Sequence, residues 1–140
     1  HLIRKLILST LEVTTIAGSL TATFADGIGT NAKFDNPNSL DISFDQSYAL
    51  IADSFNHQIR KLIISTLEVT TIAGQTSYGL INGIGSNAKF YYPYDIKISL
   101  DQSYAIIADT YNHLIRKIII WKYFVKKILL FLIVLNFFIL

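Results

Sequence analysis

The stretch NHQIRKLIISTLEVTTIAG, from Asn56 to Gly74, decides how this chain is organised, because most of it occurs more than once. A near copy, HLIRKLILSTLEVTTIAG, starts at the first residue, and a third copy opens at Asn112 as NHLIRKIII. The copies place histidines at equivalent positions with a period of 56 residues: His1, His57 and His113. Such a period indicates a repeat architecture, in which each unit buries its apolar face against its neighbours.

The first part of the unit predicts a strand and a turn. SLDISF, at residues 39–44, alternates apolar and polar residues, and DIKISL, at residues 95–100, repeats the pattern. A period of two is that of a β-strand. The apolar face of the first strand is expected to consist of Leu40, Ile42 and Phe44. DQS follows both stretches and predicts a turn, since its Asp can accept a hydrogen bond from the N–H two residues on.

The rest of the unit predicts three more strands. YALIAD (48–53) and YAIIAD (104–109) are nearly all apolar, which suits a strand covered on both faces. A short connection follows, in which Asn56 or Asn112 is expected to take a left-handed backbone. HQIRKLIIS and EVTTIAG then supply the third and fourth strands, rich in β-branched residues.

Four antiparallel strands joined by tight turns describe a propeller blade. The predicted fold is therefore all-β: a partial, open β-propeller of four-stranded blades with nine strands, followed by a hydrophobic, helical C-terminal tail. The predicted segments are 1–18, the last two strands of a partial blade; 19–36, an inter-blade loop; 37–74, a complete blade; 75–92, a second inter-blade loop; 93–120, a partial blade; and 121–140, a tail unrelated to the repeat.

The two inter-blade loops end in DGIGTNAKFDNP and NGIGSNAKFYYP. Their Asp-Gly and Asn-Gly pairs, Asp26–Gly27 and Asn82–Gly83, predict tight turns. We interpret the recurring apolar, glycine and proline positions as inter-blade packing and not as a ligand site. These positions are Gly27, Phe34, Pro37, Gly83, Phe90 and Pro93.

ADSFNHQIRK and ADTYNHLIRK, at residues 52–61 and 108–117, resemble the NHL repeat, a β-propeller family. The DG.G..A.F..P pattern that precedes each unit is similar to that of a branch of NHL-repeat proteins with long inter-blade loops. The resemblance covers residues 1 to about 120. It implies a propeller, usually of six blades, that serves as a platform for protein partners or, in some tripartite-motif proteins, for RNA. The repeat-motif positions are Asp53, Asn56, His57, Ile59, Arg60, Asp109, Asn112, His113, Ile115 and Arg116.

A carboxylate, an amide and an imidazole meet near one turn of each unit, as Asp53, Asn56 and His57 do. Such a set can bind a metal or supply a general base. Because it recurs in every unit, we interpret it as structural, with Asp and Asn bonding the turn and His packed. GIGTNA and GIGSNA match a dinucleotide-binding pattern, but the Phe and Pro that follow leave no room for the required helix. We therefore predict no catalytic residue, no metal and no cofactor.

The charge distribution does not indicate a nucleic-acid partner. The 140 residues carry a net charge of +2, and no basic face is evident. Arg60 and Lys61, with the equivalent pairs of the other units, are candidates for a basic rim that binds RNA phosphates. We expect instead that their stems lie along apolar strand edges with their charged heads in water. With no cysteine, the chain has no disulfide framework.

The third copy departs from the repeat after residue 120. WKYFVKK follows, and residues 128–140 are apolar except for Asn136. A membrane-spanning helix needs about 20 apolar residues. Three interpretations stay open: translated non-coding sequence, a membrane segment through 128–140, and a substitute fourth strand. The chain has no methionine and starts within a unit, so we expect it to be a fragment; no signal peptide is visible and the compartment stays open.

These observations predict a non-catalytic NHL-repeat propeller fragment that acts as a protein-interaction scaffold. Three alternatives remain: an RNA-binding propeller, a propeller enzyme of the gluconolactonase or amidating-lyase kind, and a membrane-anchored propeller protein. No protein partner and no small-molecule ligand can be identified from the residues.

Overall fold

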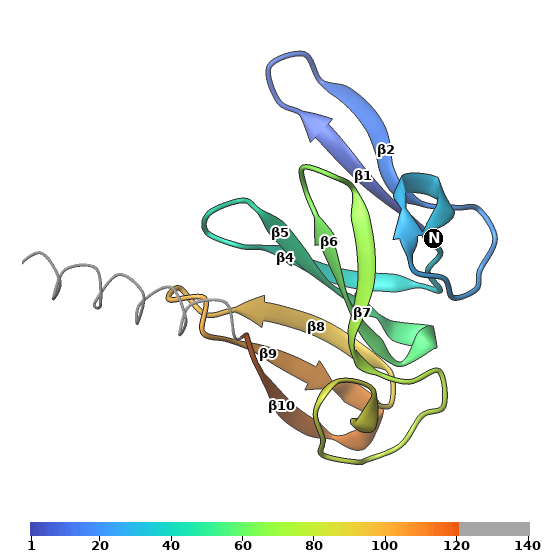
Figure 1. Cartoon of the computed structure of the whole chain (residues 1–140), viewed down its shortest axis with the longest axis vertical. Helices are drawn as coiled ribbons and strands as arrows, with labels where there is room; N and C mark the ends of the chain where they lie inside the picture. The colour runs from blue at the N-terminus through green and yellow to red at the C-terminus, as the bar shows by residue number, and fades with distance from the viewer. Residues whose placement is uncertain (121–140) are drawn as a thin grey trace, which may run out of the picture.

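The computed structural model describes residues 1–120, which form three antiparallel sheets (Figure 1). The first sheet pairs β1 (Leu2–Ile7) with β2 (Glu12–Gly18). The middle sheet has the order β3-β7-β6-β5-β4, with β3 (Gly27–Ile28), β4 (Pro37–Ile42), β5 (Tyr48–Asp53), β6 (Gln58–Ile63) and β7 (Glu68–Gly74). The last sheet has the order β10-β9-β8, with β8 (Pro93–Ile98), β9 (Tyr104–Asp109) and β10 (Leu114–Ile119). The predicted all-β class is confirmed; the predicted tail at 121–140 lies outside the described residues.

Two apolar layers join the three sheets, and β5 contributes to both because its side chains alternate between its two faces. Its odd-numbered residues Ala49 and Ile51 enter the layer between the first and middle sheets. That layer also contains Ile3, Ala17, Ala32, Phe34, Leu62 and Val69. The layer between the middle and last sheets contains Tyr48, Leu50, Ala52, Ile59, Ala73, Ala88, Phe90, Ile96, Ala105 and Ile107. All six residues of β5 are buried, so the prediction that YALIAD is covered on both faces is confirmed.

The equivalent strand β9 is covered on one face only. Ala105 and Ile107 are buried against the middle sheet, whereas Ile106 is 42% exposed. The other face is open because no further sheet packs there among residues 1–120. A neighbour missing from the described chain also explains why Leu40 of β4, a predicted apolar-face residue, is 40% exposed. Its equivalent in β8, Ile96, is 1% exposed because the middle sheet covers it.

The DQS turns form as predicted, but the loop turns do not. Asp45 accepts a hydrogen bond from the Ser47 N–H at 3.1 Å, and Asp101 accepts one from Ser103 at 3.0 Å. The tight turn predicted at Asp26–Gly27 is wrong. Gly27 begins strand β3, and the chain turns in the following one-turn 3-10 helices, η1 (Gly29–Asn31) and, in the next unit, η3 (Gly85–Asn87).

The loop 19–36 folds back along the outer edge of the middle sheet. β3 pairs with β7, with Gly27 opposite Val69, and the Gly29 N–H donates to the Leu67 carbonyl at 2.9 Å. This strand brings the described total to ten, one more than predicted. Phe34, near the end of the loop, is fully buried between the first and middle sheets.

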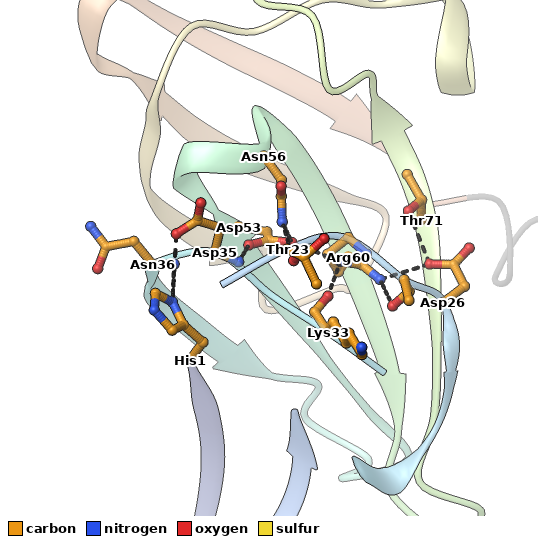
Figure 2. A network of polar contacts seen from close by, with 11 residues as sticks. His1, Thr23, Asp26, Lys33, Asp35, Asn36, Asp53, Asn56, Arg60 and Thr71 are labelled. Carbon is orange, nitrogen blue, oxygen red and sulfur yellow. Dashed lines mark hydrogen bonds and ion pairs between the residues drawn. The ribbon is translucent and has the colours of Figure 1, made fainter. Parts of the chain in front are cut away.

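A buried ion pair fastens this loop to the middle sheet (Figure 2). Arg60 on β6 is fully buried and donates from Nη1 to Asp53 Oδ2 at 2.7 Å, at the end of β5. Its guanidinium also reaches the loop, where it donates to the carbonyls of Ala25 and Lys33 at 2.7 and 3.0 Å and to the Asp26 carboxylate at 2.8 Å. The guanidinium therefore joins two strands and both arms of the loop.

The Asp53 carboxylate is satisfied on both oxygens. Oδ1 accepts the Asp35 N–H at 2.8 Å, and Oδ2 accepts the Asn56 side-chain amide at 2.9 Å as well as Arg60. Burial raises the pKa of Asp53, and the bonds from Asn56, Asp35 and Arg60 oppose that rise. The predicted exposure of the arginine heads is wrong for Arg60, because the loop carbonyls replace water as its partners.

The last sheet contains the same arrangement. Arg116 on β10 donates to Asp109 at 2.8 Å and to the Lys89 and Ile81 carbonyls at 3.1 and 2.9 Å. Asn82 takes the place of Asp26 and accepts from Arg116 at 2.8 Å. We call each set, the Asp–Arg pair with its loop carbonyls, a clamp.

A second recurring contact joins neighbouring sheets. His57 Nδ1 accepts the backbone N–H of Tyr92 at 3.1 Å, and His1 Nδ1 accepts that of Asn36 at 2.9 Å. The left-handed residue after each 3-10 turn, η2 (Ser54–Asn56) and η4 (Thr110–Asn112), is the histidine, with φ of 57° at His57 and at His113. The prediction of a left-handed asparagine is therefore wrong by one residue.

Removing the clamp arginine should strongly destabilise the fold. In Arg60→Met the Asp53 carboxylate stays buried without its partner, and we expect the free energy of unfolding to fall by about 3–5 kcal/mol. Urea unfolding of the full chain measures this. The control Arg4→Met replaces the exposed equivalent on β1 and should cost less than about 0.5 kcal/mol. Equal losses in the two variants would contradict this account of the clamp.

Acidification should weaken the contact between the middle and last sheets. Burial lowers the pKa of His57 from 6.5, although the Asp109 charge and a backbone bond near Ser54 oppose this. The unfolded chain therefore takes up the proton first. The stabilising contribution is present above pH 6.5 and is lost as the pH falls below that value.

The variant His57→Asn tests this, since its Oδ1 can accept the same N–H but does not titrate. We expect the fall in melting temperature between about pH 7.5 and 5.5 to flatten in His57→Asn. The same replacement at the exposed His113 should keep the wild-type slope. An unchanged slope in His57→Asn would show that another group controls the pH dependence.

Candidate functional site

The residues predicted from the repeat motif do not form one site. They lie in separate clamps, sheet contacts and loops, one set in each unit. Asp53, Asn56 and Arg60 belong to the clamp of the middle sheet, and Asp109, Asn112 and Arg116 to that of the last sheet. Ile59 is buried in the core, whereas Ile115 is 73% exposed on β10.

The predicted loop positions likewise serve packing contacts. Phe34 and Phe90 are buried, one in each apolar layer. Pro37 and Pro93 begin β4 and β8. Gly83 lies in the second loop, where an added Cβ would come within 2.8 Å of the Asn87 backbone.

Six aromatic side chains form a patch that the repeat motif did not reveal. They lie at the junction of the middle and last sheets: Phe55, Tyr78, Tyr91, Tyr92, Tyr94 and Tyr111. We call this patch the aromatic platform. Phe55 and Tyr111 sit in the 3-10 turns η2 and η4, Tyr78 and Tyr91 in the loop between the sheets, and Tyr94 on β8.

Tyr92 is the centre of the platform. Its ring lies 4.9 Å from Phe55, 4.9 Å from Tyr111 and 6.5 Å from Tyr94, measured between centroids. It is nearly parallel to the last two, with interplanar angles of 17° and 23°.

Tyr91 builds a second part of the platform. It stacks on Tyr78 at 4.4 Å and meets Tyr111 edge to face at 5.1 Å and 84°. The His57 ring lies 5.7 Å from both Tyr78 and Tyr91, edge-on to each. The two groups of rings are therefore continuous, and the second stands nearly perpendicular to Tyr111.

The outer rings of the platform are open to solvent. Phe55, Tyr78, Tyr94 and Tyr111 are 50%, 62%, 53% and 54% exposed. Tyr91 and Tyr92 are half-buried between them. Large apolar side chains that gather at the surface, as opposed to single exposed ones, mark interaction sites.

Two charged side chains near the platform, Asp109 and Arg116, are paired with each other. The Tyr91 N–H donates to Asp109 Oδ1 at 2.8 Å, and Arg116 is bonded to the same carboxylate group. Burial favours the neutral form of His57 by lowering its pKa. Within residues 1–120, the cations that lie over aromatic rings use Phe24, Phe34, Tyr48, Phe90 and Tyr104, none of which belongs to the platform.

The difference between the two loop copies gives the signal that sequence reasoning missed. KFYYPY in the second loop stands where the first loop has KFDNPN, so Tyr91, Tyr92 and Tyr94 replace Asp35, Asn36 and Asn38. Tyr78 likewise stands at the position of Ala22. Phe55 and Tyr111 are equivalent positions of two units, so four of the six platform rings are ones that the repeat does not copy.

Two kinds of site are absent from the described residues. No three His, Asp or Glu side chains in residues 1–120 are placed to hold one metal ion. No helix in the same range is long and apolar enough to span a bilayer.

Known proteins match both the sequence and the fold. NHL repeat-containing protein 2 from Bos taurus is 33% identical over 94 residues, which are 65% of this chain and 13% of that protein. A solved protein of unknown function from Bacteroides thetaiotaomicron has a TM-score of 0.68 and 35% identity, over 76% of this chain and 27% of that one. An auxiliary nutrient binding protein from Bacteroides ovatus has a TM-score of 0.69 over 81% of this chain and 31% of that one; at 24% identity it shows the fold alone.

No protein-family model matches the chain. The chain spans only a small part of each of these relatives. The resemblance predicted from ADSFNHQIRK and ADTYNHLIRK is nevertheless confirmed by the sequence match. The repeat of this chain is therefore similar to that of NHL repeat-containing proteins, and its three antiparallel sheets are consistent with part of a β-propeller.

Proposed function

We propose that this chain is a non-catalytic protein-interaction module and that the aromatic platform is its binding surface. The observation that carries the proposal is the contact of six aromatic rings at one loop junction, four of them at least half exposed. Clamps and histidine contacts recur in successive units and serve the fold. Phe55 and Tyr111 also occupy equivalent positions of two units, but the four loop and strand tyrosines of the platform have no aromatic counterpart in the preceding unit, as expected of a surface for a specific partner.

The composition of the platform suits a protein partner. Tyrosine is enriched at protein interfaces because its ring supplies a large, rigid contact area and its hydroxyl supplies a hydrogen bond. Nucleic-acid surfaces combine stacking rings with a basic groove that follows the phosphates. Arg60 and Arg116, the arginines of the middle and last sheets, are instead engaged in clamps.

Backbone strain at the centre of the platform supports the same proposal. Tyr92 has φ of 58°, in the left-handed region, and its equivalent Asn36 has φ of 52°. Asn tolerates this region, whereas a bulky residue there costs about 1–2 kcal/mol. Leu11 and Leu67 have φ of 60° and 58° in equivalent turns outside the platform, so it is the replacement of Asn by Tyr between copies, and not the positive φ alone, that supports the proposal. A tyrosine that stands where the preceding copy has the better-suited residue indicates a role for its ring outside folding.

Replacing the platform with the residues of the preceding copy should abolish binding and keep the fold. The variant Tyr91→Asp, Tyr92→Asn, Tyr94→Asn restores the KFDNPN sequence that folds in the first loop. A phage-displayed random peptide library selected against the full chain should yield peptides that this variant binds at least tenfold more weakly. Circular dichroism checks that the variant folds.

The control for this experiment is Phe44→Ser, which removes an aromatic ring that is 81% exposed in a turn away from the platform. It should bind the selected peptides as the wild type does. Selected peptides that bind all three proteins equally would overturn the platform as the binding surface. A library that yields no binder would overturn the proposed module.

The strain itself can be measured with two replacements of one residue. Tyr92→Asn and Tyr92→Ala both remove the ring, but only Asn suits the left-handed backbone. We expect Tyr92→Asn to be more stable than Tyr92→Ala by about 1 kcal/mol in urea unfolding. At Tyr94, which has no positive φ, the same pair of replacements should differ by less than about 0.5 kcal/mol. Equal stability of the two Tyr92 variants would show that the backbone is not strained there.

A further inference from the structure

We propose that the aromatic platform binds a proline-rich segment in the polyproline II conformation. This inference rests on the function proposed above and names the class of peptide that the platform recognises. It follows from the arrangement of the rings and from the hydrogen bond at Tyr92.

The rings of the platform take two orientations that are nearly at a right angle. Tyr111, Tyr92 and Tyr94 are nearly parallel, with centroid steps of 4.9 and 6.5 Å. Tyr91, stacked on Tyr78, stands at 84° to Tyr111. A polyproline II helix has three residues per turn, and one turn rises roughly 9 Å. One turn is thus comparable in length to the two centroid steps between Tyr111 and Tyr94, so successive turns can contact successive rings.

The hydrogen bonds available on the platform match the backbone of such a segment. Tyr92 Oη accepts the Asn36 side-chain amide at 3.1 Å, which leaves its own hydroxyl proton free to donate. The half-exposed hydroxyls of Tyr78, Tyr94 and Tyr111 are further donors. A proline-rich backbone has no internal hydrogen bonds and offers carbonyl acceptors but few N–H donors. The hydroxyl donors of the platform and the carbonyl acceptors of a proline-rich ligand are therefore complementary in hydrogen bonding.

Two other ligands that stack on tyrosine fit less well. Single-stranded nucleic acid brings phosphates, which need cations, and the clamp arginines are already bonded. A sugar needs both donors and acceptors around its ring, but the nearby Asn36 amide is used by Tyr92, and Asp109 by Tyr91 and Arg116. A stiff, uncharged chain of prolines needs neither group, and it loses little conformational freedom on binding.

The test is a titration of the full chain with decaproline, followed by isothermal calorimetry. We expect saturable binding, at least tenfold tighter than that of a Gly-Ser peptide of equal length. Tyr94→Asn and Tyr78→Ala, which replace half-exposed rings, should each weaken decaproline binding at least fivefold. Phe44→Ser should leave it unchanged. Two variants at separate edges of the platform protect the test against a folding defect in one of them.

Several outcomes would overturn the inference. These are no binding of decaproline, equal binding of the Gly-Ser peptide, equal binding by the Tyr94 and Tyr78 variants, or tighter binding of a cello-oligosaccharide or of oligothymidylate. Its failure can be told apart from that of the proposed function. If the displayed library yields peptides that lack proline and whose binding depends on the platform, the platform is supported as a protein-interaction surface and the polyproline ligand is ruled out.

Discussion

The buried pair between Asp53 and Arg60 is the interaction on which the rest of this structure depends. An arginine with no exposed surface is tolerable only if its charge is paired and nearly all of its donors are bonded. Both terminal nitrogens of Arg60 have partners, whereas Nε has none among the described residues. Here the partners come from the end of β5 and from two places in the loop 19–36. The pair therefore forms only when the loop is folded onto the sheet, and the folded loop places Phe34 between two blades.

Clamps and histidine contacts also position the aromatic platform, although the Asp53–Arg60 pair contributes no residue to the platform. In the last blade, the clamp carboxylate Asp109 accepts the N–H of Tyr91, and His57 of the middle blade accepts the N–H of Tyr92. Two adjacent backbone positions are thus fixed from two different blades. The rings that they carry are therefore held in a fixed geometry, and under the proposed function this lowers the entropic cost of binding a partner.

Much of the fold could be predicted from the sequence because the repeat period and the strand alternation are physical constraints on the backbone. The double-sided burial of β5 and the Asp45 turn follow from such patterns. The burial of Arg60 did not, since a pattern shows that an arginine recurs but not that loop carbonyls replace its water. Exposure of Leu40 also depends on which neighbouring strands the described chain contains, and alternation alone cannot express that.

The platform was missed because recurrence was used to find structure and the departures from recurrence were not weighed. In a repeat protein, a residue copied at every unit answers to a requirement that every unit shares, which is the fold. A residue that differs between copies on the same backbone is free of that requirement. Where it is also less suited to the backbone, as Tyr92 is at φ of 58° compared with Asn36 at 52°, the backbone does not explain its choice. The side chain must then be explained by its contacts: the Tyr92 ring packs against Phe55 of the middle sheet and Tyr111 of the last sheet and so forms the centre of an aromatic surface at their junction.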